Sequence, residues 1–257
     1  MDFFTLASSS AANCAFVKAG DTAVLLDAGL SALNIEKTLS EQGENAAKLA
    51  AILITHEHTD HIAGAARLAQ KFGVPVYASP KTWAALPFAD ELPRSLKRDF
   101  SYDLRIGDIT FDFCKTSHDA TQPVGMVLEA EGKRLAYVTD TGTVTRGMLH
   151  SLHDLDGLVV EANHDRQMLM QGPYAPFLKR RVLGDKGHLA NVQTARLVAY
   201  LLGQKVCPVM LAHLSETNNT PEVAYQTVLP AVAGFCAHPD KLLSVAPAHG
   251  VSVRWSL

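Results

Sequence analysis

One short segment, LITHEHTDHIAG at residues 53–64, constrains this chain more than any other. The apolar run at residues 49–54 predicts a buried strand, and the apolar residues after Asp60 follow helical spacing. The side chains between these two elements are mostly imidazoles and carboxylates, which bind zinc, manganese or iron. The segment therefore predicts a loop, between a buried strand and a helix, that directs ligands at a metal site.

The spacing within HEHTDH predicts two groups of ligands. His56 and His58 are two residues apart, so they project to the same side of an extended chain. Asp60 and His61 follow where the chain turns into the helix, and this turn directs them at a second point close by. One loop would then serve two metal ions. The alternative, a polar surface loop with chance histidines, suits a lone histidine better than this pattern.

Further ligand candidates lie at the ends of other predicted strands. They are His118 after residues 108–114, Asp140 after residues 134–139, and His213 after residues 206–212. Taken singly, each would suit a capping or packed core role as well. Their shared position at strand ends favours a ligand role, and the carboxylate of Asp140 is placed to bridge two ions.

The remaining chain alternates strand-like and helix-like segments, with neither internal repeats nor a Pro/Gly/Ser linker. Helices are expected from Asp60 through Phe72, over residues 192–202 with Asn191 as cap, and from Thr220 onwards. Further strands are expected on both sides of a turn at residues 19–21 and over residues 124–130, 157–161, 242–245 and 251–255. We predict an α+β chain forming a single domain, residues 1–257, of two β-sheets flanked by helices.

Composition limits the classes of partner and the compartment. The formal net charge of −3 gives no global signal for nucleic-acid binding, which would need a local patch. No run approaches the ~18 apolar residues of a membrane span, and Asp2 precedes the first apolar residues where a signal peptide would be basic. No Cys-x-x-Cys pair occurs, which argues against a thiolate zinc site and fits a reducing cytosol. We expect a cytoplasmic protein with no membrane partner.

The ordered set of ligand candidates resembles the metallo-β-lactamase superfamily. This resemblance implies a four-layer αββα sandwich with a dinuclear site at one edge. It implies that His56, His58 and His118 hold one metal ion. It implies that Asp60, His61 and His213 hold the other, and that Asp140 bridges both.

Two details of the pattern favour hydrolysis over redox chemistry. An Asp rather than a Cys at the bridging position, together with the Asp60–His61 pair, points away from the lactamases of the superfamily. His58 stands where the flavodiiron branch has a glutamate. The chain therefore resembles the hydrolytic members.

A closer resemblance covers nearly the full length. Segments such as KTSHDATQPVG, EANHDRQML, GPYAPFLKRRVLGDKGHLAN and LAHLSETNNTPE are similar to the YycJ/WalJ-type branch, which is nuclease-like and related to tRNase Z. The resemblance implies a DNA exonuclease that acts 5′ to 3′ and has a role in repair. One departure is an early SSAAN segment where the branch usually has more glycine.

The resemblance also implies a mechanism. Two divalent ions, Zn²⁺ or Mn²⁺, held roughly 3.5–4 Å apart would share a bridging hydroxide and stabilise the attacking and leaving oxygens at phosphorus. Asp60 then counts as a catalytic residue as well as a ligand. His188 is expected to protonate the leaving oxygen and Glu161 to orient it, while a capping or surface role is the alternative for His188. The sequence assigns no role to His164 or Asp165.

A basic run precedes His188 in PFLKRRVLGDK, and it comprises Lys179, Arg180, Arg181 and Lys186. Such a run is usually a solvated face. Beside a phosphodiester site, we expect it to contact substrate phosphates and to make affinity depend on salt. DNA is the expected partner, and the sequence leaves a dimer open.

Other functions stay open at this point. The same ions would serve a small-molecule hydrolase of an ester, thioester or lactone, or an RNase of the tRNase Z type. The pair His188 and Glu161, with the basic run, favours the DNA nuclease. A regulatory binding protein with a vestigial site is disfavoured because the ligand set is complete.

Overall fold

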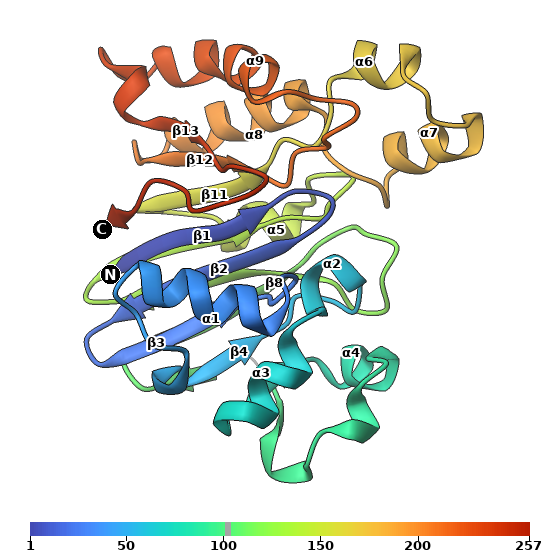
Figure 1. The fold of residues 1–257 in the computed structure, drawn as a ribbon. Coiled ribbons are helices and arrows are strands. Elements are labelled where there is room, and N and C mark those ends of the chain that lie inside the picture. Colours follow the sequence, from blue (N-terminus) through green and yellow to red (C-terminus); the bar gives the residue numbers. More distant parts are fainter. Residues whose placement is uncertain (101–103) are drawn as a thin grey trace.

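The computed structural model describes residues 1–100 and 104–257, and in it two mixed sheets pack face to face between helices (Figure 1). The first sheet has the order β14–β1–β2–β3–β4–β5–β6. Its strands are β1 (Asp2–Ser8), β2 (Asn13–Ala19), β3 (Thr22–Leu26), β4 (Ala51–Leu53), β5 (Val76–Ala78), β6 (Lys97–Asp99) and β14 (Trp255–Ser256). Its β3, β4, β5 and β6 run parallel to one another.

The second sheet has the order β13–β12–β11–β10–β9–β8–β7. Its strands are β7 (Leu104–Ile106), β8 (Ile109–Lys115), β9 (Val124–Ala130), β10 (Lys133–Val138), β11 (Gly157–Glu161), β12 (Val209–Ala212) and β13 (Leu243–Val245). Strands β10 to β13 are parallel, while β9 is antiparallel to both β8 and β10. The carboxyl ends of β8, β10, β11 and β12 therefore lie at one edge.

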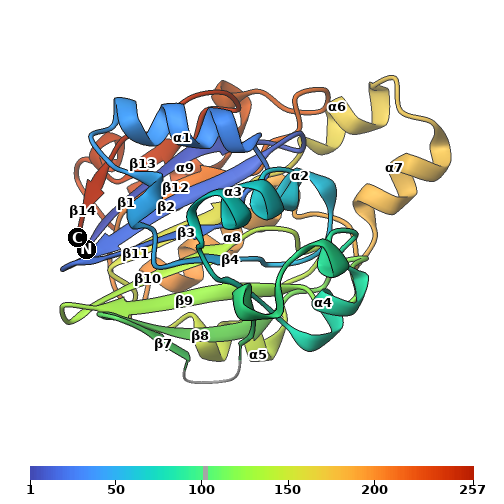
Figure 2. The ribbon, with the colours of Figure 1, turned by 60° about the horizontal axis from the view of Figure 1, so that its bottom comes forward.

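Nine α-helices occur in the part of the chain that the structure describes. They are α1 (Ala32–Glu41), α2 (Thr59–Ile62), α3 (Ala65–Phe72), α4 (Pro80–Ala85), α5 (Arg146–Ser151), α6 (Arg166–Gln171), α7 (Pro176–Leu183), α8 (Asn191–Leu202) and α9 (Pro221–Ala233). Helices α6 and α7 stand out from the sandwich as an arm (Figures 1 and 2). None of the helices within residues 1–100 and 104–257 has both the length and the hydrophobicity to span a bilayer.

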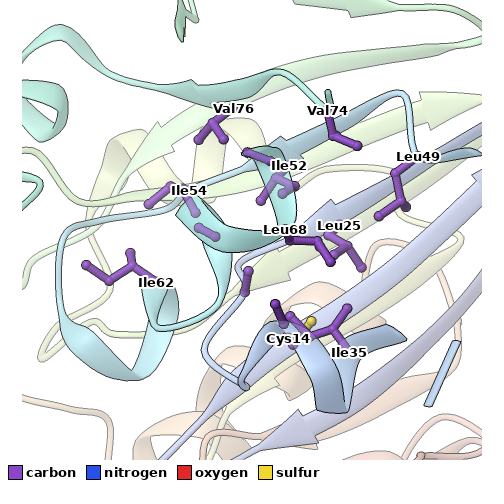
Figure 3. Close-up of a cluster of buried hydrophobic side chains, with 14 of the residues drawn as sticks. Cys14, Leu25, Ile35, Leu49, Ile52, Ile54, Ile62, Leu68, Val74 and Val76 are labelled. Carbon is purple, nitrogen blue, oxygen red and sulfur yellow. The ribbon is translucent and has the colours of Figure 1, made fainter. Parts of the chain in front are cut away.

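Three layers of buried side chains explain this arrangement. Alternate residues of the first sheet face opposite sides, so Val24 packs between the sheets while Leu25 packs under α1 and α3. Figure 3 shows part of this second layer, in which Leu25 lies near Ile35 of α1 and Leu68 of α3. A third layer lies under α5, α8 and α9, and it includes Val160. The predicted four-layer αββα sandwich is confirmed.

The predicted helix from Asp60 through Phe72 is wrong in one respect, because the structure has two helices there, α2 and α3. The chain changes direction at Gly64, whose N–H donates to the carbonyl of Ala28 over 2.8 Å. A Cβ at Gly64 would lie 2.2 Å from the carbonyl oxygen of Leu30. Tertiary packing on the segment after β3 therefore interrupts the helical pattern.

The other differences are shifts of element boundaries. Helix α8 begins at Asn191 with Ala190 as its N-cap, so Asn191 is not the cap. The Asn191 side chain instead exchanges hydrogen bonds of 2.9 and 2.8 Å with Asn219. Strand β12 begins at Val209 rather than at residue 206. Of the strand predicted over residues 251–255, only Trp255 is in a strand, and β14 continues to Ser256.

Gly29, in the segment after β3, packs closely against the backbone of the predicted metal-binding loop. A Cβ at this position would lie 1.7 Å from the backbone oxygen of Asp60. We expect Gly29→Ala to lower the free energy of unfolding by about 1–3 kcal/mol, because two backbone segments must separate. Urea unfolding monitored by circular dichroism measures this, with Gly147→Ala as control since its Cβ meets nothing closer than 3.9 Å. Equal losses in both variants would contradict the packing argument.

Candidate metal centre

The predicted ligands come together at the edge where several parallel strands end. His56 and His58 follow β4, His118 follows β8, Asp140 follows β10 and His213 follows β12. Two of these residues adopt left-handed backbone conformations, Asp140 with φ 58° and His213 with φ 54°. Such conformations are unfavourable for residues other than glycine and cluster at functional sites.

The first group of ligand atoms comes from His56, His58 and His118. His58 Nδ1 lies 3.1 Å from His56 Nε2 and 3.2 Å from His118 Nε2. Burial and the neighbouring imidazoles hold the pKa of His56 well below its ordinary value, and burial lowers the pKa of His118. Neutral rings of this kind have lone pairs available for a cation.

The second group comes from Asp60, His61 and His213. Asp60 Oδ2 lies 3.3 Å from His61 Nε2 and 3.5 Å from His213 Nε2. Burial alone would lower the pKa of His213, but the carboxylates around it outweigh burial and raise the pKa to about 10. The same negative charge that holds a proton on His213 also attracts a metal cation in its place.

Asp140 lies between the two groups. Its Oδ2 is 3.3 Å from His61 Nε2, and its Oδ1 is 3.5 Å from His213 Nε2 and 3.6 Å from His118 Nε2. Among the described residues, Asp140 Oδ2 and His213 Nε2 are buried and have no hydrogen-bond partner. Buried polar atoms without partners are costly, and an ion offsets that cost. The donor set therefore fits a divalent metal site.

A carboxylate that the sequence analysis did not single out orients the second group. Asp27, after β3, has φ 59° and places Oδ2 2.7 Å from His61 Nδ1. The backbone N–H and the hydroxyl of Thr55 both donate to this buried carboxylate. Carboxylate partners of this kind fix the ring of a metal-ligating histidine. The only signal in the sequence was an Asp at the end of an apolar run.

Glu161 and His188 meet as predicted, beside this donor set. His188 Nδ1 lies 3.1 Å from Glu161 Oε2 and 3.8 Å from Asp140 Oδ1. The other oxygen of Glu161 accepts from the backbone N–H groups of Thr141 and Leu189 over 2.7 and 3.2 Å. Burial alone would raise the pKa of Glu161, but hydrogen bonds with His188 and His213 outweigh it and lower the pKa to about 2. Glu161 is thus an ionised carboxylate that the backbone holds in place next to Nδ1 of His188.

A pocket of about 460 Å³ opens onto the donor set, and His188 lines it. The arm closes one side of this pocket with Tyr174, Leu178, Arg181 and Val182. Arg181 is held there by Asp119, whose Oδ2 accepts from Arg181 Nε over 2.5 Å.

Of the four basic residues predicted to contact substrate, only Arg181 lines the pocket. Lys179 donates to the carbonyl of Met170 over 2.7 Å, while Arg180 and Lys186 are exposed on the arm and just beyond it. The basic run is therefore divided between the pocket and the outer surface of the arm.

His164 and Asp165, to which the sequence assigned no role, have different surroundings. Asp165 caps α6 by accepting from the N–H groups of Gln167 and Met168 over 2.9 Å. His164 is buried, and its ring nitrogens have no hydrogen-bond partner among the described residues. Burial lowers the pKa of His164 to about 4, so its ring is neutral.

Comparison with known families agrees with this geometry. The model of the β-lactamase superfamily domain matches residues 22–209. The chain belongs to the metallo-β-lactamase superfamily. The structure of YhfI from Bacillus subtilis, a metallo-β-lactamase fold protein, matches with a TM-score of 0.74 over 98% of each chain at 19% identity. This family membership, together with the exodeoxyribonuclease relatives described next, identifies the protein as a metal-dependent hydrolase.

The resemblance to the YycJ/WalJ-type branch is also confirmed. The exodeoxyribonuclease WalJ of Streptococcus pneumoniae is 38% identical over 233 residues, which cover 89% of this chain and 87% of the relative. The exodeoxyribonuclease YycJ of Bacillus anthracis is 37% identical over 231 residues, which cover 89% and 88%. The similarity thus extends well beyond the metal-binding loop.

Proposed function

We propose that this member of the metallo-β-lactamase superfamily is a dinuclear phosphodiesterase that degrades DNA from an end, 5′ to 3′, in repair. The observation that carries the proposal is the His188–Glu161 pair beside a complete His/Asp donor set, five of whose residues line one pocket together with His188. The names of two relatives at 37–38% identity over 89% of this chain, both exodeoxyribonucleases, support DNA as the substrate.

The donor atoms suit two ions. One would be held by His56, His58 and His118, and the other by Asp60, His61 and His213, with the carboxylate of Asp140 shared. Imidazole and carboxylate ligands fit Zn²⁺ and Mn²⁺. When bound, such ions activate a water molecule and neutralise charge on the phosphate.

The chain's own residues would supply the proton. His188 is part-exposed in the pocket, and its Nδ1 is fixed by Glu161, so its Nε2 is free to face the substrate. Departure of a sugar oxygen from phosphorus needs a proton, and a histidine in hydrogen-bond reach is a common donor. Glu161 acts as a positioning residue because its contact of 3.1 Å with Nδ1 fixes the orientation of the ring.

Arg181 would bind a substrate phosphate. Arg181 lines the pocket and its Nε donates to Asp119, so its two terminal nitrogens would remain for the phosphate oxygens. We expect Arg181→Ala to raise the KM for DNA by about 5- to 30-fold. The slope of log KM against the logarithm of the salt concentration should fall by about 1, which corresponds to the loss of one phosphate contact. Steady-state kinetics over a salt series measure both. Arg67→Ala, which removes an exposed charge from α3, is the control, and equal effects in both variants would contradict a specific phosphate contact.

Two further parts of the proposal concern organisation. Residues 1–257 would form a single domain, which the continuous core between the two sheets supports. The protein would act in the cytoplasm, where its free thiols Cys14, Cys114, Cys207 and Cys236 would stay reduced.

A substrate panel tests the proposed function. Metal-loaded wild-type protein and the Asp60→Asn variant are incubated with single-stranded DNA, duplex DNA, RNA, a thioester and a lactone. We expect wild-type protein to degrade DNA fastest and the variant to be inactive. Cleavage of RNA alone would support an RNase of the tRNase Z type, and cleavage of the thioester or lactone with DNA left intact would support a small-molecule hydrolase. Either outcome would overturn the proposal.

A further inference from the structure

The arm carries apolar side chains that the pocket does not use. Phe177 is 68% exposed and Met170 is 60% exposed. They lie on α7 and α6, the helices that stand out from the sandwich (Figures 1 and 2). Single exposed hydrophobic residues are ordinary on protein surfaces. We consider these two together because they lie close in the chain to residues that line the pocket and to the basic residues of the arm.

Helix geometry places Phe177 at the border between the pocket and solvent. Leu178 and Arg181 of α7 line the pocket. Phe177 is adjacent in sequence to Leu178 and one helical turn from both Arg180 and Arg181, and residues three and four apart are neighbours on a helix surface. The exposed ring thus continues the pocket wall outward, next to an exposed guanidinium.

Lys179 connects Met170 to the same surface. Its ammonium donates to the Met170 carbonyl over 2.7 Å, so it ties α7 to the last turn of α6. The arm, residues 166–183, has four Lys/Arg and no Asp or Glu, a net charge of +4, whereas the whole chain has −3. The arm is therefore a local basic patch with apolar side chains within it.

This combination of chemistry fits an unpaired nucleic-acid strand. Bases stack on exposed aromatic rings, phosphates contact the cations between them, and neither contact depends on sequence. A protein partner would favour an apolar centre depleted of charge, which is not the composition here. The continuity of the surface with the pocket points to the strand whose end is being cleaved.

We propose that the arm surface formed by Met170, Phe177 and Arg180 holds the unpaired DNA strand next to the scissile phosphate, with a base stacked on the Phe177 ring. This inference rests on the proposed nuclease function and adds to it a substrate class, DNA with a single-stranded end. The arm then acts as a grip outside the metal centre, and Phe177 contributes to binding rather than to the chemical step.

Kinetics of Phe177 variants on single-stranded DNA test the inference. We expect Phe177→Ala to raise KM by about 5- to 100-fold with kcat nearly unchanged, because base–aromatic stacking contributes about 1–3 kcal/mol. Phe177→Trp should retain the wild-type KM and show quenching of its fluorescence when DNA binds. Phe235→Ala, which removes a 40% exposed ring outside the arm, is the matched control and should match the wild type.

A substrate without bases separates stacking from other roles of the ring. With abasic sites at the nucleotides that reach the arm, wild-type protein should show the raised KM of Phe177→Ala, and the variant should show no further loss. An unchanged KM for Phe177→Ala would overturn the inference while the nuclease function stands. Dissociation of a dimer by Phe177→Ala, seen by light scattering, would also overturn it, since the surface would then bind a second copy. Inactivity of the wild-type protein on every DNA would instead refute the proposed function.

Discussion

Replacing Asp140 by asparagine is expected to remove at least one metal ion per chain and to lower kcat on DNA by at least about 10²-fold. The carboxylate lies within 3.3–3.6 Å of histidine nitrogens from both ligand groups. Asparagine has nearly the same shape but lacks the negative charge, so the loss would come from charge rather than from packing. Metal content after dialysis, measured by plasma mass spectrometry, gives the result directly.

The control for this variant is Asp90→Asn, which neutralises an exposed carboxylate outside the centre. It should retain the metal content and activity of the wild type. Far-ultraviolet circular dichroism of Asp140→Asn should match the wild type, which would exclude unfolding as the cause. Retention of both ions by Asp140→Asn would contradict a shared carboxylate.

Replacing His188 by alanine is expected to lower kcat on DNA by about 10²- to 10⁴-fold, which is the usual contribution of a general acid. The metal content should not change, because His188 is not one of the proposed metal ligands and its Nδ1 contacts Glu161. The loss should largely disappear on a phosphodiester with a p-nitrophenyl leaving group, since that group departs without a proton. Comparison of kcat on the two substrates therefore isolates the proton-donating role.

His153→Ala provides the matched control because His153 is an exposed histidine outside the pocket. Its kcat should equal that of the wild type on both substrates. Glu161→Gln should show a smaller version of the His188→Ala pattern, since the His188 ring would remain but lose its fixed anion. An equal loss on DNA and on the activated diester in His188→Ala would mean that the histidine does not donate the proton.

Sequence reasoning succeeded where the signal was local. Imidazoles and carboxylates crowd into residues 56–61 between a strand and a helix, so their grouping in space can be predicted from spacing alone. His118, Asp140 and His213 were predicted as ligands from their shared position at the ends of predicted strands, and the structure brings their side chains together. These parts of the site depend little on the details of packing.

Sequence reasoning failed where a contact joins distant segments. Asp27 looks like any polar residue after an apolar strand, and only the fold brings it to His61, 34 residues away. Asp119 and Arg181 are 62 residues apart, so the pairing that separates Arg181 from its exposed neighbour Arg180 could not be predicted. The break at Gly64 has the same origin, since the helical pattern continues and only a close backbone approach interrupts it.

One comparison tests the central claim, that this centre is a phosphodiesterase acting on DNA ends. Metal-loaded wild-type protein is incubated with linear DNA labelled at the 5′ end and with a covalently closed circle of the same sequence, and Asp60→Asn serves as the inactive control. We predict that label is released from the linear DNA from the earliest times, while the circle stays intact and the variant releases nothing. Cleavage of the circle, or linear DNA left intact by metal-loaded protein, would contradict the account.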